Sequence, residues 1–399
     1  MRQVLSHTAL ICALLTHAGQ SNASDITGNT FERLFVNDSA MAGTAVRQLP
    51  DGGYILTGFV QDIEAGDEDV LVMRTDSLGS ELWRKIYGGP GEDNGWDIQA
   101  TEDAGFILTG YTSSFGHGGL DVWLLRLDPR GDTLWTRTFG GADNERSWSV
   151  CDLEGGGYLI AAQTRSFGHG ERDTWLICTD SSGDTLWTAI AGGTQVDRIF
   201  SVDQLTDGSV VATGITNSEG QGDMDMLVMR YALSGERIWQ RTYGSPAKDI
   251  GHGIGATRDG GMIVAGYSNG VGDGDEDLLL MRLNENGDSL WSSTAGRALD
   301  DRGMIARELS GGGYVCVGYS RDTLWGRWDG YIVRADDDGE ILWKRAFGTP
   351  YDEIITSVIE TADRGFAMIG RSWRRGGRTP DLYFVKTDSL GRFDPMTGQ

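Results

Sequence analysis

GWDIQATEDAGFILTGYTSSFGHGGLDVWLLRLDPRGDTLWTRTFGG, residues 95–141, contains four short runs of β-prone residues separated by turns. The runs are 95–101, 105–111, 121–127 and 133–139. Runs of this length bounded by Gly and Asp are typical of strands, and short connections make neighbouring strands antiparallel. No part of the stretch shows the 3.6-residue period of an amphipathic helix. The stretch therefore predicts one four-stranded antiparallel sheet.

The same pattern recurs along the chain at a fixed step of 52 residues, carried by a tryptophan, an aspartate and a glycine. The three series are Trp83, Trp135, Trp187, Trp239, Trp291 and Trp343; Asp69, Asp121, Asp173, Asp225, Asp277, Asp329 and Asp381; and Gly79, Gly131, Gly183, Gly235, Gly287, Gly339 and Gly391. Seven such units cover nearly the whole chain. A four-stranded unit repeated at this period is typical of a β-propeller blade. We therefore predict an all-β, seven-bladed β-propeller over residues 24–395.

The two ends of the repeat distinguish a closed ring from an open solenoid. The seventh copy stops after Gly391 and lacks its fourth strand, whereas FERLF at 31–35 places Phe31 and Phe35 52 residues before Trp83 and Tyr87. An N-terminal strand that completes the last blade removes an exposed sheet edge and joins the chain ends. We expect the ring to close in this way.

Composition and charge narrow the class of protein. The 399 residues include 60 Gly, 7 Pro and 13 Trp, and 39% are hydrophobic, which excludes collagen, a disordered linker and a helical bundle. The net charge is -24, with 58 acidic against 34 basic residues. A surface this acidic repels phosphate backbones, so we expect no nucleic-acid partner.

The N-terminus resembles a secretory signal peptide over residues 1–23. Arg2 is followed by an apolar stretch from about Thr8 to Thr16, and Ser21 and Ala23 suit a cleavage before Ser24. The alternative is a disordered cytosolic N-terminus. No apolar run reaches the roughly 20 residues that cross a bilayer, so no transmembrane segment is expected. Localisation outside the cytoplasm, in the periplasm, at the cell surface or in the medium, follows from the signal-peptide interpretation.

Three cysteines remain after such a cleavage, namely Cys151, Cys178 and Cys316. Their number is odd and they have no CxxC spacing, which indicates neither a zinc site nor a disulfide framework. We expect buried, chemically silent side chains.

The repeated tryptophans are expected to pack between neighbouring blades, because a ligand-stacking residue would not recur in six units. Their motif D-x-x-G-x-x-x-W, as in Asp76, Gly79 and Trp83, resembles the tryptophan-docking motif of pyrroloquinoline-quinone propellers, and more distantly WD-repeat propellers. The Asp-to-Gly spacing is one residue shorter here, and the vicinal disulfide and calcium site of those enzymes have no counterpart. The resemblance therefore supports blade packing and does not imply the cofactor, so we expect none.

The whole unit resembles secreted bacterial propeller-repeat proteins, which carry G-D-x-D, an apolar run, K/R-x-D-x-x-G and W-x-x-x-Y-G-G. The resemblance covers residues 31–391 and implies a propeller fold and export more than any chemistry.

Two acidic series and one basic series recur with the blades. The aspartates from Asp69 to Asp381 and the set Asp93, Glu145, Asp197, Asp249, Asp301 and Glu353 stand at strand starts, where we expect them to accept hydrogen bonds from loop N–H groups. Calcium in acid-rich loops such as 272–277 is the alternative, without EF-hand spacing to support it. The basic set is expected to supply salt-bridge or turn partners, and comprises Arg74, Arg126, Arg230, Arg282, Arg334 and Lys386.

Variation between the units concentrates in the loop joining the second and third strands. In units one to five this loop is Gly-rich and polar, whereas units six and seven read SRDTLWGRWD and SWRRGGRTPD. They bring together the candidate ligand-binding residues Arg321, Trp325, Arg327, Trp328, Arg371, Trp373, Arg374, Arg375 and Arg378. Arginine binds carboxylate or phosphate and tryptophan stacks on a sugar or apolar face, so an acidic glycan or acidic protein segment would suit them. Alternatively, the indoles cover the closure seam and the arginines balance nearby acids.

We predict no catalytic residues. His117, His169 and His252 have no Ser or Cys partner in a nucleophile motif. A glycosidase needs two carboxylates at a controlled separation, which sequence does not give. The prediction is a secreted, non-enzymatic binding module for a glycan or protein; the alternatives are a carbohydrate-active enzyme and a structural surface protein without a small ligand.

Overall fold

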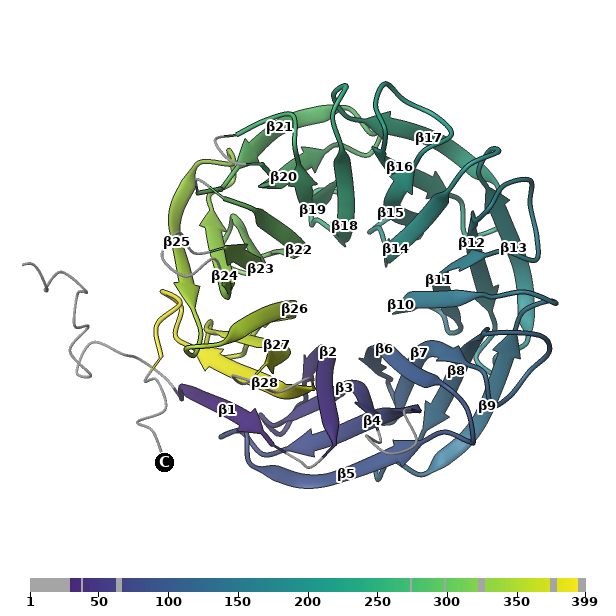
Figure 1. The fold of residues 1–399 in the computed structure, drawn as a ribbon, viewed down its shortest axis with the longest axis horizontal. Helices are drawn as coiled ribbons and strands as arrows, with labels where there is room; N and C mark the ends of the chain where they lie inside the picture. The colour runs from purple at the N-terminus through teal and green to yellow at the C-terminus, as the bar shows by residue number, and fades with distance from the viewer. Residues whose placement is uncertain are drawn as a thin grey trace, which may run out of the picture.

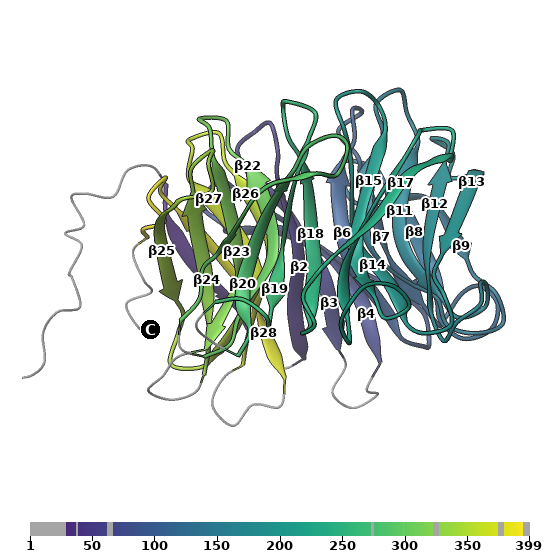
Figure 2. The same ribbon diagram turned by 90° about the horizontal axis from the view of Figure 1, so that it is seen from above.

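Seven four-stranded antiparallel sheets surround a central axis and form a closed disc (Figures 1 and 2). The computed structural model describes residues 29–36, 39–61, 67–272, 275–297, 299–321, 327–373 and 379–393. Over these ranges every regular element is a strand. The predicted all-β, seven-bladed propeller is confirmed.

In six blades the strands follow chain order from the axis to the rim, and in the seventh β1 lies at the rim outside β28. The blades are β2 (Ala40–Gln48), β3 (Tyr54–Gln61), β4 (Glu68–Thr75) and β5 (Glu81–Tyr87); β6 (Asp93–Ala100), β7 (Phe106–Thr112), β8 (Asp121–Leu127) and β9 (Thr133–Phe139); β10 (Arg146–Asp152), β11 (Tyr158–Thr164), β12 (Asp173–Thr179) and β13 (Thr185–Ala191); β14 (Asp197–Gln204), β15 (Val210–Thr216), β16 (Asp225–Tyr231) and β17 (Arg237–Tyr243); β18 (Asp249–Ala256), β19 (Met262–Ser268), β20 (Asp277–Leu283) and β21 (Ser289–Thr294); β22 (Asp301–Glu308), β23 (Tyr314–Arg321), β24 (Trp328–Ala335) and β25 (Ile341–Phe347); and β26 (Asp352–Glu360), β27 (Phe366–Trp373) and β28 (Pro380–Thr387), which β1 (Phe31–Phe35) completes.

The ring closes through the N-terminal strand, as predicted. β1 pairs antiparallel with β28, with Phe31 opposite Lys386 and Phe35 opposite Leu382. An open solenoid is therefore excluded. The strands run from Phe31 to Thr387. The proposed signal peptide, and the ends of the predicted domain at 24–28 and 394–395, lie outside the described residues.

The middle strands form the core of each blade. All seven residues of β7 and all seven of β8 are buried, whereas β9 at the rim is exposed or half-buried throughout. Apolar clusters span the junctions between blades; one joins Val70 and Val72 to Leu108 and Leu125. Because each blade shields a face of its neighbour, the apolar surface of every sheet is removed from water only in the closed ring.

The repeated tryptophans dock on the neighbouring blade. Trp187 donates its indole N–H to the carbonyl of Leu233 at 2.8 Å, and a Cβ on Gly235 would lie 2.8 Å from its ring. The φ of Gly235 is +89°, a left-handed conformation that favours glycine. The predicted packing between blades is confirmed, with the indoles half-buried at the rim.

The recurring charged residues hold the loops, as expected. Asp121 accepts the backbone N–H of His117 at 2.8 Å, and Glu145 accepts that of Gly141 at 2.8 Å. Of the basic set, Arg74, Arg126, Arg230, Arg282 and Lys386 pair with an aspartate, and Arg334 donates to the carbonyls of Gly312 and Tyr314 instead.

The three predicted spectator cysteines are free and buried. Burial raises the thiol pKa of Cys178 to about 11 and raises those of Cys151 and Cys316 further, which keeps all three protonated at neutral pH.

Candidate functional site

A β-bulge in the innermost strand of every blade turns one side chain into the central channel. The pairing of β6 with β7 skips Trp96, and the same shift recurs in the other six innermost strands. A bulged residue leaves the ladder and its side chain is re-aimed, here toward the channel. The seven bulge residues are Thr44, Trp96, Trp148, Phe200, His252, Met304 and Thr356.

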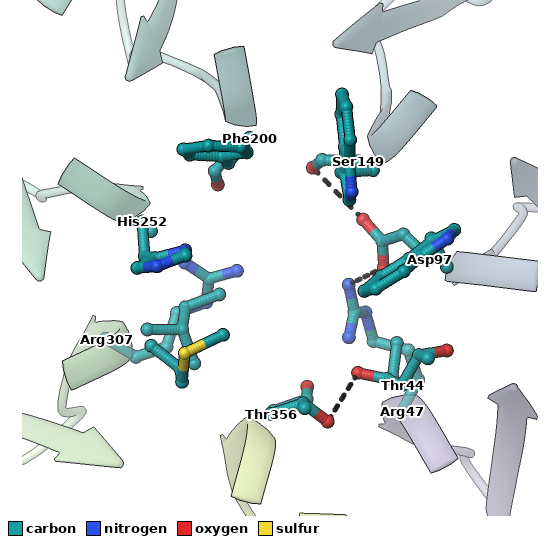
Figure 3. A pocket seen from close by; sticks show the side chains of 16 residues that line it. Thr44, Arg47, Asp97, Ser149, Phe200, His252, Arg307 and Thr356 are labelled. Carbon is teal, nitrogen blue, oxygen red and sulfur yellow. Dashed lines mark hydrogen bonds and ion pairs between the residues drawn. The ribbon is translucent and has the colours of Figure 1, made fainter. Parts of the chain in front are cut away.

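These residues line a cavity of about 210 Å³ on the propeller axis (Figure 3). Each innermost strand contributes its bulge residue and the residue after it, and Arg47 and Arg307 complete the lining. The second positions are Ala45, Asp97, Ser149, Ser201, Gly253, Ile305 and Ser357. The lining is therefore built mainly from two adjacent structural positions repeated around the ring, and the bulge position carries five residue types in the seven blades.

The polar second positions hold the bulges in place across blade boundaries. Asp97 accepts the backbone N–H of Val150 at 3.1 Å and the hydroxyl of Ser149 at 3.2 Å. Ser201 accepts the backbone N–H of Ile254 in the next blade at 3.2 Å. A bulge interrupts the ladder and leaves backbone groups to be satisfied elsewhere. These side chains supply the missing acceptors and fix the channel wall.

Four consecutive blades place aromatic rings in the channel, and we call Trp96, Trp148, Phe200 and His252 the aromatic arc. The rings of Trp148 and Phe200 meet edge-on with centroids 5.6 Å apart, and those of Phe200 and His252 are stacked at 5.0 Å. All four are half-buried and so present a face to the cavity. The indole N–H of Trp96 is screened from solvent and has no hydrogen-bond partner among the described residues.

The charges of the cavity are unevenly compensated. Arg47 forms an ion pair with Asp97 at 2.8 Å. Arg307 donates to the carbonyls of Ile254 and Ala306, at 2.9 and 3.2 Å. Burial lowers the pKa of His252 to about 4, with Arg302 and Lys248 adding repulsion, so its imidazole is neutral at pH 7. The lining thus carries one cation more than it has anions.

The sequence-predicted loop cluster is described in part. Trp325, Arg374, Arg375 and Arg378 lie outside the described residues. On blade 6 the guanidinium of Arg321 lies 5.8 Å from the ring centroid of Trp328, and its Nη1 lies 3.4 Å from a carboxylate oxygen of Asp300. Arg327 donates to the carbonyl of Pro350.

On blade 7 the guanidinium of Arg371 lies 5.0 Å from the ring centroid of Trp373. The structure thus places two arginine–tryptophan pairs, Arg321 with Trp328 and Arg371 with Trp373, on adjacent blades. Their role in ligand binding stays a prediction.

Two arrangements were missed by sequence reasoning. The first is the bulge, which does not change the repeat length. The sequence signal for it is the variable residue between Gly95 and Asp97, and at the equivalent positions of the other units. The second is an arginine cluster on blades 3 and 4, comprising Arg146, Arg165, Arg172 and Arg198. Arg146 and Arg198 stand 52 residues apart at the same repeat position, and this recurrence is the sequence signal for the arginine cluster.

The three histidines have different settings. His117 and His169 are exposed in loops whose N–H groups Asp121 and Asp173 accept, whereas His252 lies in the channel. Among the described residues, no three or more His, Cys, Asp or Glu side chains gather to hold a metal ion. Residues 273–274 of the loop considered for calcium lie outside those ranges. The described ranges also contain no helix with the length and apolar character of a membrane span.

Comparisons with known proteins support the fold. No family model matches the sequence. The regulatory protein FlaEY of Caulobacter vibrioides is 24% identical over 187 residues, which cover 40% of this chain and 20% of that protein.

Among solved structures, the WD40 domain of Neurospora crassa Pan2 is similar with a TM-score of 0.53, 8% identity and coverage of 86% of this chain and 89% of that one. Puromycin hydrolase (S511A mutant, complexed with PGG) has a TM-score of 0.55 and 16% identity, covering 88% and 52%. Sqt1 of Chaetomium thermophilum has a TM-score of 0.50 and 12% identity, covering 89% and 92%. At these identities the similarity concerns the fold alone, and the chain is a seven-bladed β-propeller of four-stranded blades, the architecture it shares with WD40 domains.

Proposed function

We propose that the chain is a non-enzymatic binding module that takes a sugar ring of a glycan against the aromatic arc of its central channel. The observation that carries the proposal is the arc itself: at the bulge position, which lines the cavity in every blade, four consecutive blades carry Trp, Trp, Phe and His. Flat aromatic faces in a partly enclosed pocket are what binding sites use for a ring-shaped ligand with an apolar face.

The polar groups of the cavity support a sugar more than a purely apolar ligand. The cavity is also lined by the hydroxyl-bearing side chains of Ser149, Ser201 and Ser357, which suit the hydroxyl groups of a sugar. Arg307 offers its charge to an acidic substituent. The arginine–tryptophan pairs of blades 6 and 7 would extend the contact along a longer chain.

The carbohydrate-active alternative finds less support in the same lining. Glycoside hydrolysis needs two carboxylates flanking the bond that is cleaved. Among the described lining residues the one carboxylate is Asp97, and it is occupied by Arg47, Ser149 and the backbone of Val150. These contacts use the Asp97 carboxylate to hold the channel wall together.

The experiment is a glycan array followed by calorimetric titration of the ligands found. Trp96→Ala and Trp148→Ala should weaken binding at least tenfold, since aromatic anchors contribute about 2 kcal/mol or more at a binding centre. The matched control is Phe167→Ala, which removes an exposed ring, 39% accessible, that packs on Trp175 and does not line the cavity. Equal affinity of native protein and both tryptophan variants would refute the site, and an array without any signal would refute the glycan ligand.

We propose in addition that the module acts outside the cytoplasm after removal of residues 1–23. The basis is the apolar stretch and small residues before Ser24. N-terminal sequencing of the protein recovered from its native host should begin at Ser24. Recovery of intact Met1 from the cytoplasmic fraction would contradict export.

A further inference from the structure

Four arginines gather on blades 3 and 4 beside the channel mouth. Arg146 begins β10, Arg198 is the second residue of β14, and Arg165 and Arg172 lie at the two ends of the loop joining β11 and β12. We call these four residues the arginine cluster. All of them belong to the face of the propeller that carries the loops between second and third strands.

Backbone contacts fix the positions of the cluster. The carbonyl of Arg172 accepts the N–H of Asp197, the residue before Arg198, at 2.8 Å. The N–H of Arg165 donates to the carbonyl of Asn144 at 3.2 Å and to the carboxylate of Glu145, the residue before Arg146, at 3.1 Å. Each loop arginine is therefore held next to a strand arginine by hydrogen bonds between the two chain segments.

Ion pairs compensate the charge of the arginine cluster only in part. Arg146 has a loose ion pair with Glu92, at 3.7 Å, and lies 4.7 Å from the ring centroid of Tyr111. Arg165 donates to the backbone carbonyl of Glu171 at 3.4 Å, not to its carboxylate. Over the described ranges, Arg172 and Arg198 form no ion pair. In a chain of net charge -24, four neighbouring arginines with one ion pair of 3.7 Å and the attraction of Glu171 for Arg172 are a local excess of positive charge.

Arg198 is the most constrained member. It is half-buried, and its Nε is shielded from solvent without a hydrogen-bond partner among the described residues. Burial lowers the pKa of this guanidinium, and the charges of Arg172, Arg146 and Arg165 lower it further. Like charges held together at this cost are expected where an anion completes the site.

We propose that the arginine cluster is an anion-binding subsite for the sulfate or carboxylate group of an acidic sugar whose ring rests on the aromatic arc. The second half of this inference rests on the proposed function; the anion site itself does not. Arg146 and Arg198 precede Trp148 and Phe200 by two residues, and two strand residues span about 7 Å. One acidic mono- or disaccharide reaches both groups.

A compact ligand fits the charge distribution better than a long polyanion. The -24 surface repels an extended chain of charges, whereas the attraction of the cluster acts within the screening length of about 8 to 10 Å. Guanidinium forks recognise sulfate and carboxylate through paired hydrogen bonds.

The test begins with inorganic sulfate and glucuronate, titrated separately by calorimetry at low ionic strength into the full chain. We expect saturable binding of at least one of them, weakened about tenfold or more in the Arg172→Gln/Arg198→Gln double variant. The matched control is Arg130→Gln, which removes one charge from an exposed arginine in the turn between β8 and β9, on the opposite face. It should bind as the native protein does.

Thermal unfolding separates a lost site from a lost fold. Because the double variant removes mutual repulsion, it should unfold at the same temperature as the native protein or higher, and sulfate should stabilise the native protein alone. Absence of saturable binding in the native protein, or unchanged binding in the double variant, would overturn the inference.

A third titration, with neutral and sulfated galactan fragments of equal length, distinguishes this inference from the proposed function. If the double variant loses only the preference for the sulfated fragment, the anion site and the proposed glycan binding are both supported. If sulfate binds through the cluster and neither fragment does, the anion site stands and the glycan function fails. If both fragments bind equally to native and double variant, the function stands and the anion site fails.

Discussion

Replacing Phe31 by alanine should open the ring at its seam. Phe31 occupies the repeat position of the docking tryptophans, but it is 5% exposed where they are half-buried. Its ring lies edge-on to Phe384 of β28 at 5.0 Å and to Tyr54 of blade 1 at 6.1 Å. A Cβ on Gly79 would lie 2.6 Å from it. One side chain therefore joins the last blade to the first.

The magnitude follows from complete burial of a phenyl ring among fixed neighbours. Deleting such a ring costs about 3 to 5 kcal/mol, from lost transfer free energy and the cavity left behind. Urea unfolding followed by tryptophan fluorescence and far-UV circular dichroism gives the free energy of unfolding. Limited proteolysis should release the N-terminal segment of the variant first, because the edge of β28 becomes accessible.

The control is Leu82→Ala on the outer strand of blade 1, where the side chain is 59% exposed and the change should stay within about 0.5 kcal/mol. A loss below about 1 kcal/mol for Phe31→Ala, or equal losses in the two variants, would refute closure by a packed N-terminal strand as the source of ring stability.

Three further predictions concern the blades. Gly79→Ala should lower the free energy of unfolding in urea more than Gly52→Ala does. Both positions have positive φ, +75° and +84°, but a Cβ at Gly52 meets its nearest atom at 3.8 Å, whereas one at Gly79 meets the Phe31 ring at 2.6 Å. Equal losses in the two variants would show that the strain lies in the backbone alone. Burial raises the pKa of Glu353 from 4.5 to about 7, so between these pH values Glu353 is ionised in the unfolded chain and protonated in the folded one. The free energy of unfolding should therefore fall with rising pH by about 3 kcal/mol in total. Glu353→Gln should flatten this pH dependence, and parallel pH profiles of the native protein and the variant would contradict the assignment. Arg282→Met should lower the free energy of unfolding by about 1 to 3 kcal/mol, because it leaves the carbonyl of Met262 without its side-chain donor. Arg137→Met at the exposed rim should change it little. Similar losses for the two variants in thermal or urea unfolding would exclude a special role for the buried arginine.

The fold was predictable because the same physical constraint recurs in every blade. A tryptophan, an aspartate and a glycine at a constant spacing leave one way to stack seven sheets, and FERLF supplied the missing strand. The recurring ion pairs could be predicted as well. Blade 3 has Gly155 where blade 2 has Asp103, and Cys178 where blade 2 has Arg126, so the ion pair disappears as a unit.

The candidate site was harder to predict, because its members are ordered by the ring and not by the chain. The sequence drew attention to the loops of blades 6 and 7, whose composition departs from the other five. A bulge at Trp96 leaves the 52-residue step intact, and the run GWDIQAT still alternates. Only pairing with β7 shows that Trp96 leaves the ladder. Arg172 and Arg198 become neighbours through a contact between blades that no local pattern encodes.

The bulge explains how one repeat can serve both a uniform scaffold and a varied channel. A side chain on either face of a blade packs against a neighbour, so changing it alters the ring. Trp96 and its equivalents leave the ladder and line the channel, although Thr44 and Thr356 also donate hydrogen bonds to backbone carbonyls of the next blade. The next position is different, because Asp97 accepts the N–H of Val150 across the blade boundary. Five residue types at the bulge position and a conserved structural task at the next make the channel lining the part of this propeller where the scaffold accommodates different binding chemistry.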